Sequence, residues 1–295
     1  MLPCPGKASR DVRQTSTRAT ASGEHMGVRA VIPSWGAPSS RAYRKPTIRR
    51  GATVLSAWLA TTVLVGCSVP LSARADIPAS ASLPEHPAWM STQQLAAWNN
   101  DGFVVFNNEW NTAQAGPQMI WANSFHSWGV ESKQPLSTSV KTYPSVQRNY
   151  NNVPLAKFTE LSSSFNQSMP AFTDFDAESA YDIWLNDYKI EIMIWVDNHG
   201  QTPAGNVITS AWLQDQRFTV WQAGPTMFSF VLANWRETSG HVNILSFLRW
   251  LVQRRYLSDH AALRQVDFGW EIASTEGIPM AFVMKDYSLI SNPQP

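Results

Sequence analysis

The sequence predicts an all-β sandwich of antiparallel sheets with one helix packed on it. From about Trp89 to Ile290, short apolar or alternating runs are separated by Asn, Gly, Pro and Ser, the pattern of strands joined by turns. With one exception, no helical segment lies between these runs. Many short strands without intervening helices favour an antiparallel sandwich over a parallel α/β fold.

The predicted strands span residues 103–107, 118–122, 139–143, 158–165, 179–185, 189–196, 206–213, 217–222, 226–233, 264–273 and 280–287. The exception lies between residues 239 and 256, where apolar residues recur every three or four positions and predict an amphipathic helix. Ser239 fits its N-cap, and Arg254 and Arg255 fit its C-terminal end, where the helix dipole favours cations. We expect this helix to pack against the outside of a sheet.

Residues 1–67 are predicted to be a leader outside this domain. The first 50 residues hold ten Lys or Arg and two acids, and residues 51–67 hold no charge. A basic stretch followed by about fifteen mostly apolar residues is typical of an export signal. Leu64-Val-Gly-Cys67 resembles a bacterial lipobox, so we expect Cys67 to carry lipid and to hold the protein at the outer face of the cell membrane. Cleavage near Ala75, which would release a secreted protein, stays open.

Residues 68–88, rich in Ala, Ser and Pro, are predicted to be a tether, and residues 89–295 a single domain. Beyond residue 67 the chain holds 13 basic and 20 acidic residues, which argues against a nucleic-acid partner. Cys4 and Cys67 are the only cysteines, so the domain cannot form an internal disulfide. The six histidines lack the spacing of a zinc site, and we expect no metal or cofactor and a monomeric protein.

Two glutamates lie inside strand-like apolar runs. Glu191 is part of Ile-Glu-Ile-Met-Ile-Trp-Val, and Glu271 is part of Asp-Phe-Gly-Trp-Glu-Ile. Because side chains alternate along a strand, each glutamate shares a face with the residues two positions away and lies opposite the apolar set. The glutamate faces are Glu191, Met193 and Trp195 in one run, and Asp267, Gly269 and Glu271 in the other. A pair of opposed carboxylates is the minimal equipment for hydrolysing a glycosidic bond.

The sequence resembles glycoside hydrolase family 12 over roughly residues 100–288. The resemblance is carried by four motifs that occur in the family in this order: Asn107-Asn-Glu-Trp-Asn111, Ser179-Ala-Tyr-Asp-Ile-Trp184, Ile190-Glu-Ile-Met-Ile-Trp195 and Phe268-Gly-Trp-Glu-Ile272. It implies a β-jelly-roll sandwich of two antiparallel sheets with a concave substrate cleft. It also implies endo-acting hydrolysis of β-1,4-glucosidic bonds in cellulose-like glucans with retention of configuration.

By this resemblance Glu191 is the nucleophile, Glu271 the general acid/base, and Asp182 the acid that hydrogen-bonds the nucleophile. The residues that it assigns to substrate binding are Asn108, Trp110, Met193, Trp195 and Pro203. Retention requires the two carboxyls to lie about 5–5.5 Å apart, one ionised and one protonated. Their mutual repulsion is then expected to push their pKa values apart, with Glu191 ionised and the pKa of Glu271 raised.

Two alternatives remain open at this point: a hydrolase of xyloglucan or mixed-linkage β-glucan with the same fold, and a non-catalytic carbohydrate-binding jelly roll. The second predicts an aromatic groove but has no use for a paired nucleophile and acid. Trp110 lies two residues after Asn108, where an apolar run gives way to polar residues. We therefore expect both to lie on one strand face, and the polar neighbours imply that this face is wet, so the indole of Trp110 can stack on a sugar ring.

Overall fold

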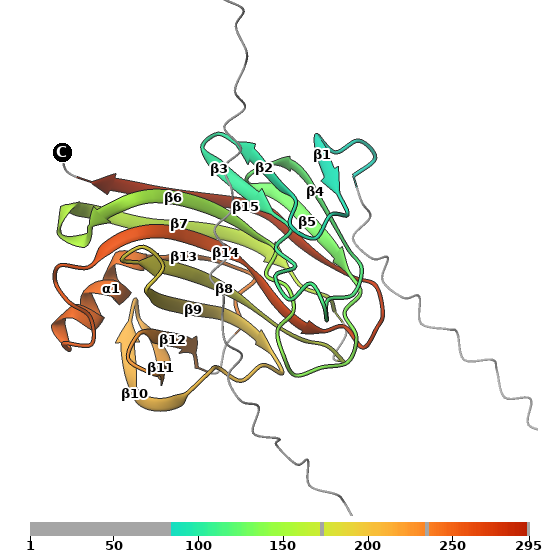
Figure 1. Ribbon diagram of the computed structural model, residues 1–295. Coiled ribbons are helices and arrows are strands. Elements are labelled where there is room, and N and C mark those ends of the chain that lie inside the picture. The colour runs from blue at the N-terminus through green and yellow to red at the C-terminus, as the bar shows by residue number, and fades with distance from the viewer. Residues whose placement is uncertain (1–83, 172–173, 234–235, 294–295) are drawn as a thin grey trace, which may run out of the picture. The chain divides into compact units, whose positions relative to one another are not determined.

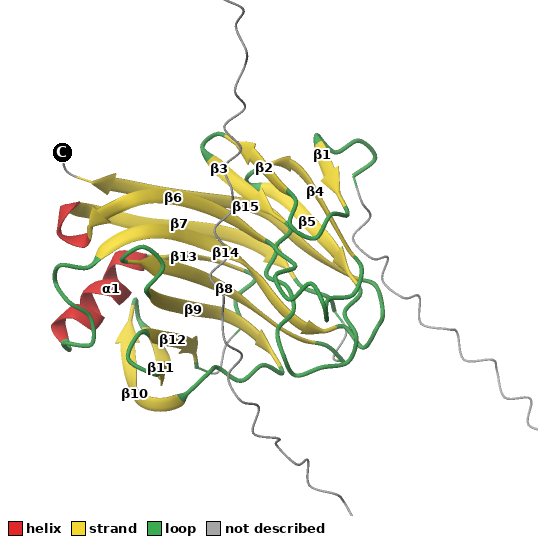
Figure 2. Cartoon of the chain, in the orientation of Figure 1, coloured by secondary structure: helices red, strands yellow, loops and turns green. Residues whose placement is uncertain are grey.

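A computed structural model describes residues 84–171, 174–233 and 236–293. The leader, Cys67 and most of the tether therefore lie outside the described residues. The described chain forms a β-jelly-roll sandwich of two sheets with one α-helix (Figures 1 and 2). In this part of the chain no helix is long and apolar enough to cross a membrane.

The smaller sheet has six strands in the order β1-β4-β5-β15-β7-β13. Their bounds are β1 (Trp89–Ser91), β4 (Gln118–Ser124), β5 (Ser127–Ser132), β7 (Phe158–Ser168), β13 (Ser239–Val242) and β15 (Met280–Pro293). All of its ladders are antiparallel. A short 3-10 helix (Leu155–Lys157) precedes β7.

The larger sheet has nine strands in the order β10-β11-β12-β9-β8-β14-β6-β3-β2. Their bounds are β2 (Ala97–Asn100), β3 (Phe103–Phe106), β6 (Ser145–Pro154), β8 (Asp176–Leu185), β9 (Ile190–His199), β10 (Asn206–Leu213), β11 (Gln216–Ala223), β12 (Met227–Leu232) and β14 (Ala262–Ser274). One ladder departs from the predicted antiparallel pattern: β12 pairs with β9 in parallel, because the β10-β11-β12 meander folds back beside β9.

The core lies between the two sheets. Trp128 of β5 packs on Trp270 of β14, with ring centroids 4.9 Å apart, and Phe165 of β7 packs on Phe268 of β14 at the same distance. Trp128 and Trp270 are completely buried, so part of the high tryptophan content fills the core and does not bind sugar. The Trp270 indole donates to Gln167 across the sheets (3.0 Å), which satisfies its polar atom in this apolar layer.

The helix is shorter than predicted and packs elsewhere. α1 spans Ile244–Gln253, and its N-cap is Asn243, whose side chain accepts from the Ser246 amide; Ser239 instead begins β13. Phe247 packs against the core-facing side of the nine-stranded sheet, with its ring 5.0 Å from that of Phe218 and 5.1 Å from that of Phe230. The prediction that the helix covers the outside of a sheet was therefore wrong, because its broad apolar face completes the core.

Most predicted strands exist, and several of them, such as β7, β8, β14 and β15, extend beyond their predicted bounds. The predicted strand at 139–143 is wrong: this segment makes only an isolated bridge between Thr142 and Ile272, and the strand begins at Ser145. Lys141 explains the difference, because its buried amino group donates to the backbone carbonyls of Pro135 and Ala273 and so ties down an irregular loop. Strands β1, β2, β5, β6 and β13 were not predicted.

Candidate active site

Three neighbouring strands at the centre of the nine-stranded sheet bring the predicted catalytic residues onto one face. β8 lies between β9 and β14. Glu191 of β9 pairs with Trp184 of β8, and Glu271 of β14 pairs with Glu178 of β8. The predicted alternation holds, because Ile192 and Ile194 lie in the core cluster while Met193 and Trp195 lie in a separate one. We call the face that carries Glu191, Met193 and Trp195 the outer face.

A small apolar cluster forms part of the outer face. It consists of Ala180, Met193 and Trp195, with Met227 and Val231 packed against it. Met193 is 2% exposed and Trp195 is 4% exposed, so neither side chain is an open platform. The buried indole nitrogen of Trp195 has no hydrogen-bond partner among the described residues, which leaves one donor on this face unused.

The outer face is also rich in buried carboxyls. Glu178, Asp182, Glu191 and Asp267 are each less than 9% exposed, and Glu271 is partly exposed. No cation of the described chain forms an ion pair with any of the five. A buried carboxyl without a cation nearby is more stable in its neutral form, so burial raises the pKa values of these groups. Perturbed pKa values of this kind are characteristic of catalytic sites.

The pKa values of Glu191 and Glu271 are both raised. Burial, and then repulsion from Glu271, raises the pKa of Glu191 to about 8. Burial also raises the pKa of Glu271, and a hydrogen bond from Glu178 opposes that shift. The sequence led us to expect a raised pKa for Glu271 alone. The difference arises because Glu191 is also buried and forms no ion pair with a cation of the described residues.

Asp182 lies diagonally across from Glu191, since it pairs with Met193 on β9. Burial raises its pKa, and the charges of Glu191, Asp267 and Glu271 raise it further, while a hydrogen bond from the Trp184 side chain lowers it. Its hydrogen bond thus involves Trp184, the residue directly opposite Glu191. The predicted hydrogen bond between Asp182 and Glu191 stays a prediction, but the electrostatic interaction between the two is present.

Three further residues of the site were not singled out from the sequence. Asp267 pairs directly with Asp182, and Glu178 pairs directly with Glu271. The Tyr143 hydroxyl donates to the Ala180 carbonyl (2.9 Å), and its pKa is raised by burial and then by Asp182, Asp267 and Glu271. The alternation had already placed Asp267 on the Glu271 face without a role, and Glu178 could have been found in the same way, because it lies four residues before Asp182 on the same strand face. Tyr143 belongs to Thr142-Tyr-Pro-Ser145, a segment that also resembles family 12, but its sequence neighbours do not indicate a contact with the carboxyls.

The other predicted binding residues have different surroundings. Trp110 is 39% exposed, whereas Pro203 is buried in the loop between β9 and β10. β3 ends at Phe106, and Asn108 has φ 40°, so Asn108 and Trp110 do not share a strand face and that part of the reasoning was wrong. The Asn108 carbonyl accepts a hydrogen bond from the Tyr143 amide (2.9 Å). This bond connects the Asn107–Asn111 motif to Tyr143, whose side chain lies near the buried carboxyls.

Gly269 lies between Asp267 and Glu271 on the outer face, and the close approach of neighbouring backbone requires a glycine there. A Cβ at this position would lie 2.0 Å from the carbonyl oxygen of Pro144 and 2.8 Å from the Cα of Ser145. Any side chain would therefore push β6 away from β14. The glycine keeps the two strands paired next to Glu271, which fixes the height of that carboxyl on the sheet.

Comparisons with known proteins agree with this geometry. A curated relative, endoglucanase S of Pectobacterium parmentieri, is 29% identical over 212 residues, which cover 61% of this chain and 79% of the relative. The solved xyloglucanase domain of NopAA from Sinorhizobium fredii, in complex with cellobiose, is 28% identical, with a TM-score of 0.61 over 70% of this chain and 100% of that chain. The chain is a glycoside hydrolase with the family 12 fold.

A further solved structure supports the fold assignment. The native family 12 xyloglucanase from Bacillus licheniformis superposes on this hydrolase with a TM-score of 0.60 and 22% identity, over 69% of this chain and all of that chain. No family model matches the sequence.

The pH dependence of the hydrolase is expected to reflect the raised pKa of Glu191. Attack needs the ionised carboxylate, and kcat/KM reports the ionisation of the free enzyme. As the pH falls, Glu191 takes up a proton and attack stops; because its pKa is about 8 rather than 4.5, half of the active form is lost by about pH 8 and most of it by neutral pH. We expect the acid limb of kcat/KM, measured on a soluble glucan, to lie well above pH 5. An acid limb at about pH 4–5 would contradict this description of the site.

Trp110→Ala is expected to weaken binding of glucan oligomers by about 5–30-fold, or about 1–2 kcal/mol, because an exposed indole can stack on a sugar ring. Stability should change little, since a fully buried Trp would cost about 3–5 kcal/mol on truncation. Tyr256→Ala is the control: its ring is 38% exposed but packs beside α1 on Trp250 and Phe228. Binding calorimetry measures the affinity of each variant for glucan oligomers, and thermal melts measure its stability. Unchanged affinity in Trp110→Ala would make Trp110 structural.

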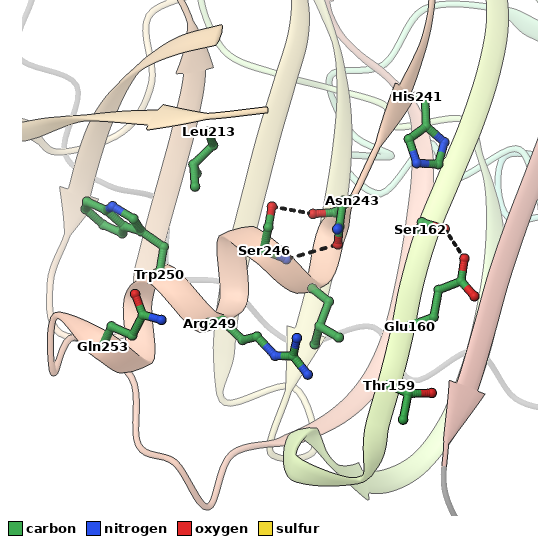
Figure 3. A pocket seen from close by; sticks show the side chains of 11 residues that line it. Thr159, Glu160, Ser162, Leu213, His241, Asn243, Ser246, Arg249, Trp250 and Gln253 are labelled. Carbon is green, nitrogen blue, oxygen red and sulfur yellow. Dashed lines mark hydrogen bonds between the residues drawn. The ribbon is translucent and has the colours of Figure 1, made fainter. Parts of the chain in front are cut away.

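A pocket between β7 and α1 lies apart from these residues (Figure 3). Two of its charged groups are already bonded within the protein. Glu160 accepts from Ser162 (3.0 Å) and Asn292 (2.8 Å), and Arg249 donates to the Phe158 carbonyl (3.1 Å). None of the predicted site residues lines it, so we assign the chemistry to the outer face.

Proposed function

We propose that this chain is a member of glycoside hydrolase family 12 that cleaves β-1,4-glucosidic bonds within glucan chains with retention of configuration. The observation that carries the proposal is the placement of Glu191 and Glu271 on one face of one sheet, where they repel each other and have raised pKa values. The names of the endoglucanase relative and of the structure with bound cellobiose support a glucan substrate.

In the proposed reaction Glu191, ionised, attacks the anomeric carbon and forms a glycosyl ester. Glu271, protonated, gives its proton to the leaving oxygen and then takes a proton from the water that hydrolyses the ester. The pair must hold one proton in total at the start. Repulsion between the two carboxyls favours this state, because loss of the first proton makes loss of the second more difficult.

Xyloglucan is a second candidate substrate. Two of the similar proteins of known structure are xyloglucanases, one of them at 28% identity. The deciding experiment is product analysis on amorphous cellulose, mixed-linkage β-glucan and xyloglucan with the wild-type protein and with Glu191→Gln. Internal cleavage of at least one polymer, lost in the variant, supports the proposal. Cleavage that persists in the variant, or binding without any cleavage, contradicts it.

We also propose that the hydrolase is exported as a monomer, with Cys67 acylated and holding it at the outer face of the cell membrane. The Leu64-Val-Gly-Cys67 sequence at the end of an uncharged stretch supports this. Mass spectrometry of the exported protein tests it. A lipid-modified N-terminal cysteine is expected, and an unmodified N-terminus near Asp76 would show that the protein is secreted without an anchor.

A further inference from the structure

Glu178 is the nearest cross-strand neighbour of Glu271. In the antiparallel β8–β14 ladder the two residues are directly opposite each other, so their side chains leave the same face of the sheet close together. Glu178 is completely buried, and Glu271 is partly exposed. Besides its own backbone amide, Glu271 is the one group of the described residues that hydrogen-bonds the Glu178 carboxyl. A fully buried carboxyl with so few partners is more stable as the neutral acid.

A hydrogen bond between the two carboxyls stabilises this arrangement. Two carboxylates cannot hydrogen-bond each other without a proton between them, so one of the pair is a carboxylic acid. Burial, followed by the charge of Glu271, raises the pKa of Glu178 well above its usual value, and the hydrogen bond from Glu178 lowers the pKa of Glu271. Because Glu178 is completely buried and Glu271 is partly exposed, the proton stays on Glu178, which makes Glu178 the donor and Glu271 the acceptor.

We propose that Glu178, as a neutral acid, is a positioning residue for the acid/base Glu271: it donates a hydrogen bond that orients the Glu271 carboxyl and stabilises its ionised form. This inference rests on the proposed function, because it presumes that Glu271 exchanges a proton with the substrate. When Glu271 gives its proton to the leaving oxygen, its new carboxylate accepts from the Glu178 hydroxyl, and Glu178 keeps its own proton. When Glu271 later takes a proton from water, that interaction weakens again.

Other charged groups nearby do not supply this interaction. The charge of Glu271 is also repelled by the charges of Glu191 on β9 and Asp182 on β8. Tyr143, in the segment before β6, interacts with Glu271 only electrostatically. On the β9 side Glu178 faces Asn198, which is neutral.

The charged residues next to Asn198 are engaged with each other. Asp197 bonds to His199 (3.4 Å) and to Arg236 (3.8 Å). On the far side of β14, Lys141 donates to the carbonyls of Pro135 and Ala273. Within the described chain, then, Glu178 alone donates a side-chain hydrogen bond to Glu271.

Two variants of Glu178 test the proposal. Glu178→Gln keeps a neutral donor of the same length, since the amide N–H can replace the carboxyl O–H. Glu178→Leu keeps the volume but removes the donor. The basic limb of the kcat/KM profile reports loss of the Glu271 proton. We expect this limb to move to higher pH in Glu178→Leu, with kcat on glucan reduced about tenfold or more. In Glu178→Gln the limb should stay in place, with kcat within about threefold of wild type.

If Glu178→Leu does not fold, Glu178→Asp replaces it, because the shorter acid cannot reach Glu271 and should move the limb in the same direction. A purely structural Glu178 would change the melting temperature in these variants without moving the limb, and that result would overturn the proposal. The activity of Glu271→Gln distinguishes failure of the proposed function from failure of the role proposed for Glu178. If that variant is fully active, the proposed function fails; if it is impaired while the Glu178 variants leave the limb unmoved, only the role of Glu178 fails.

Discussion

Glu191→Gln is expected to lower kcat on glucan by at least about 10⁴-fold, because it removes the group that forms the covalent intermediate. Gln has the same size and shape, so the loss should not arise from unfolding. The stability argument has a definite sign. Since the pKa of Glu191 is about 8 in the folded protein and near 4.5 when exposed, the folded state binds more protons, and this residue costs stability as the pH rises between those values.

Glu191→Gln should therefore be at least as stable as wild type at pH 8, although it is inactive. The control is Glu276→Gln, the same chemical change at an exposed turn position, which should leave both activity and stability unchanged. Hydrolysis of soluble glucan and thermal melts at pH 8 measure the two quantities. Activity within tenfold of wild type in Glu191→Gln would exclude Glu191 as the nucleophile.

Glu271→Gln is expected to have an effect that depends on the leaving group. With glucan, whose leaving alcohol needs a proton, the rate should fall by about 10²–10⁴-fold, the usual contribution of a general acid/base. With a dinitrophenyl cellobioside the first step needs no proton donor, so a rapid burst of phenolate should precede a slow steady state. In that steady state the glycosyl ester waits for water that is no longer activated.

Azide, a nucleophile that needs no general base, should raise the steady-state rate of Glu271→Gln and leave that of Glu191→Gln unchanged. Glu191→Gln thus serves as the matched comparison, since it should lose the burst as well. Equal losses on both substrates, without a burst, would show that Glu271 does not act as the acid/base.

The alternation of apolar residues was enough to predict which way the side chains of β9 and β14 point. Ile192, Ile194 and Trp270 are completely buried in the core, while Met193 and Glu191 lie on the outer face. This succeeds because a slip of one residue would exchange the two faces, so the pattern strongly specifies the register. The resemblance to family 12 then added the order of the motifs.

Features set by pairing between distant strands could not be predicted in the same way. Glu178 faces Glu271 only because β8 begins at Asp176, three residues before its predicted start, and because β14 pairs with it in that register. The pKa of Glu191 depends on burial by several strands and on a second carboxyl that lies 80 positions away in the sequence. The irregular loop around Lys141 depends on the carbonyl of Ala273, which lies 132 positions away in the sequence.

Trapping the covalent intermediate tests the central claim most directly. A 2-deoxy-2-fluoro cellobioside with a good leaving group forms a glycosyl ester with a retaining hydrolase and slows its breakdown, and digestion with mass spectrometry then locates the sugar. The proposed mechanism predicts one added cellobiosyl group, on the peptide that contains Glu191, and none in Glu191→Gln. Label on a peptide without Glu191, or hydrolysis of glucan with inversion and no labelling, would contradict it.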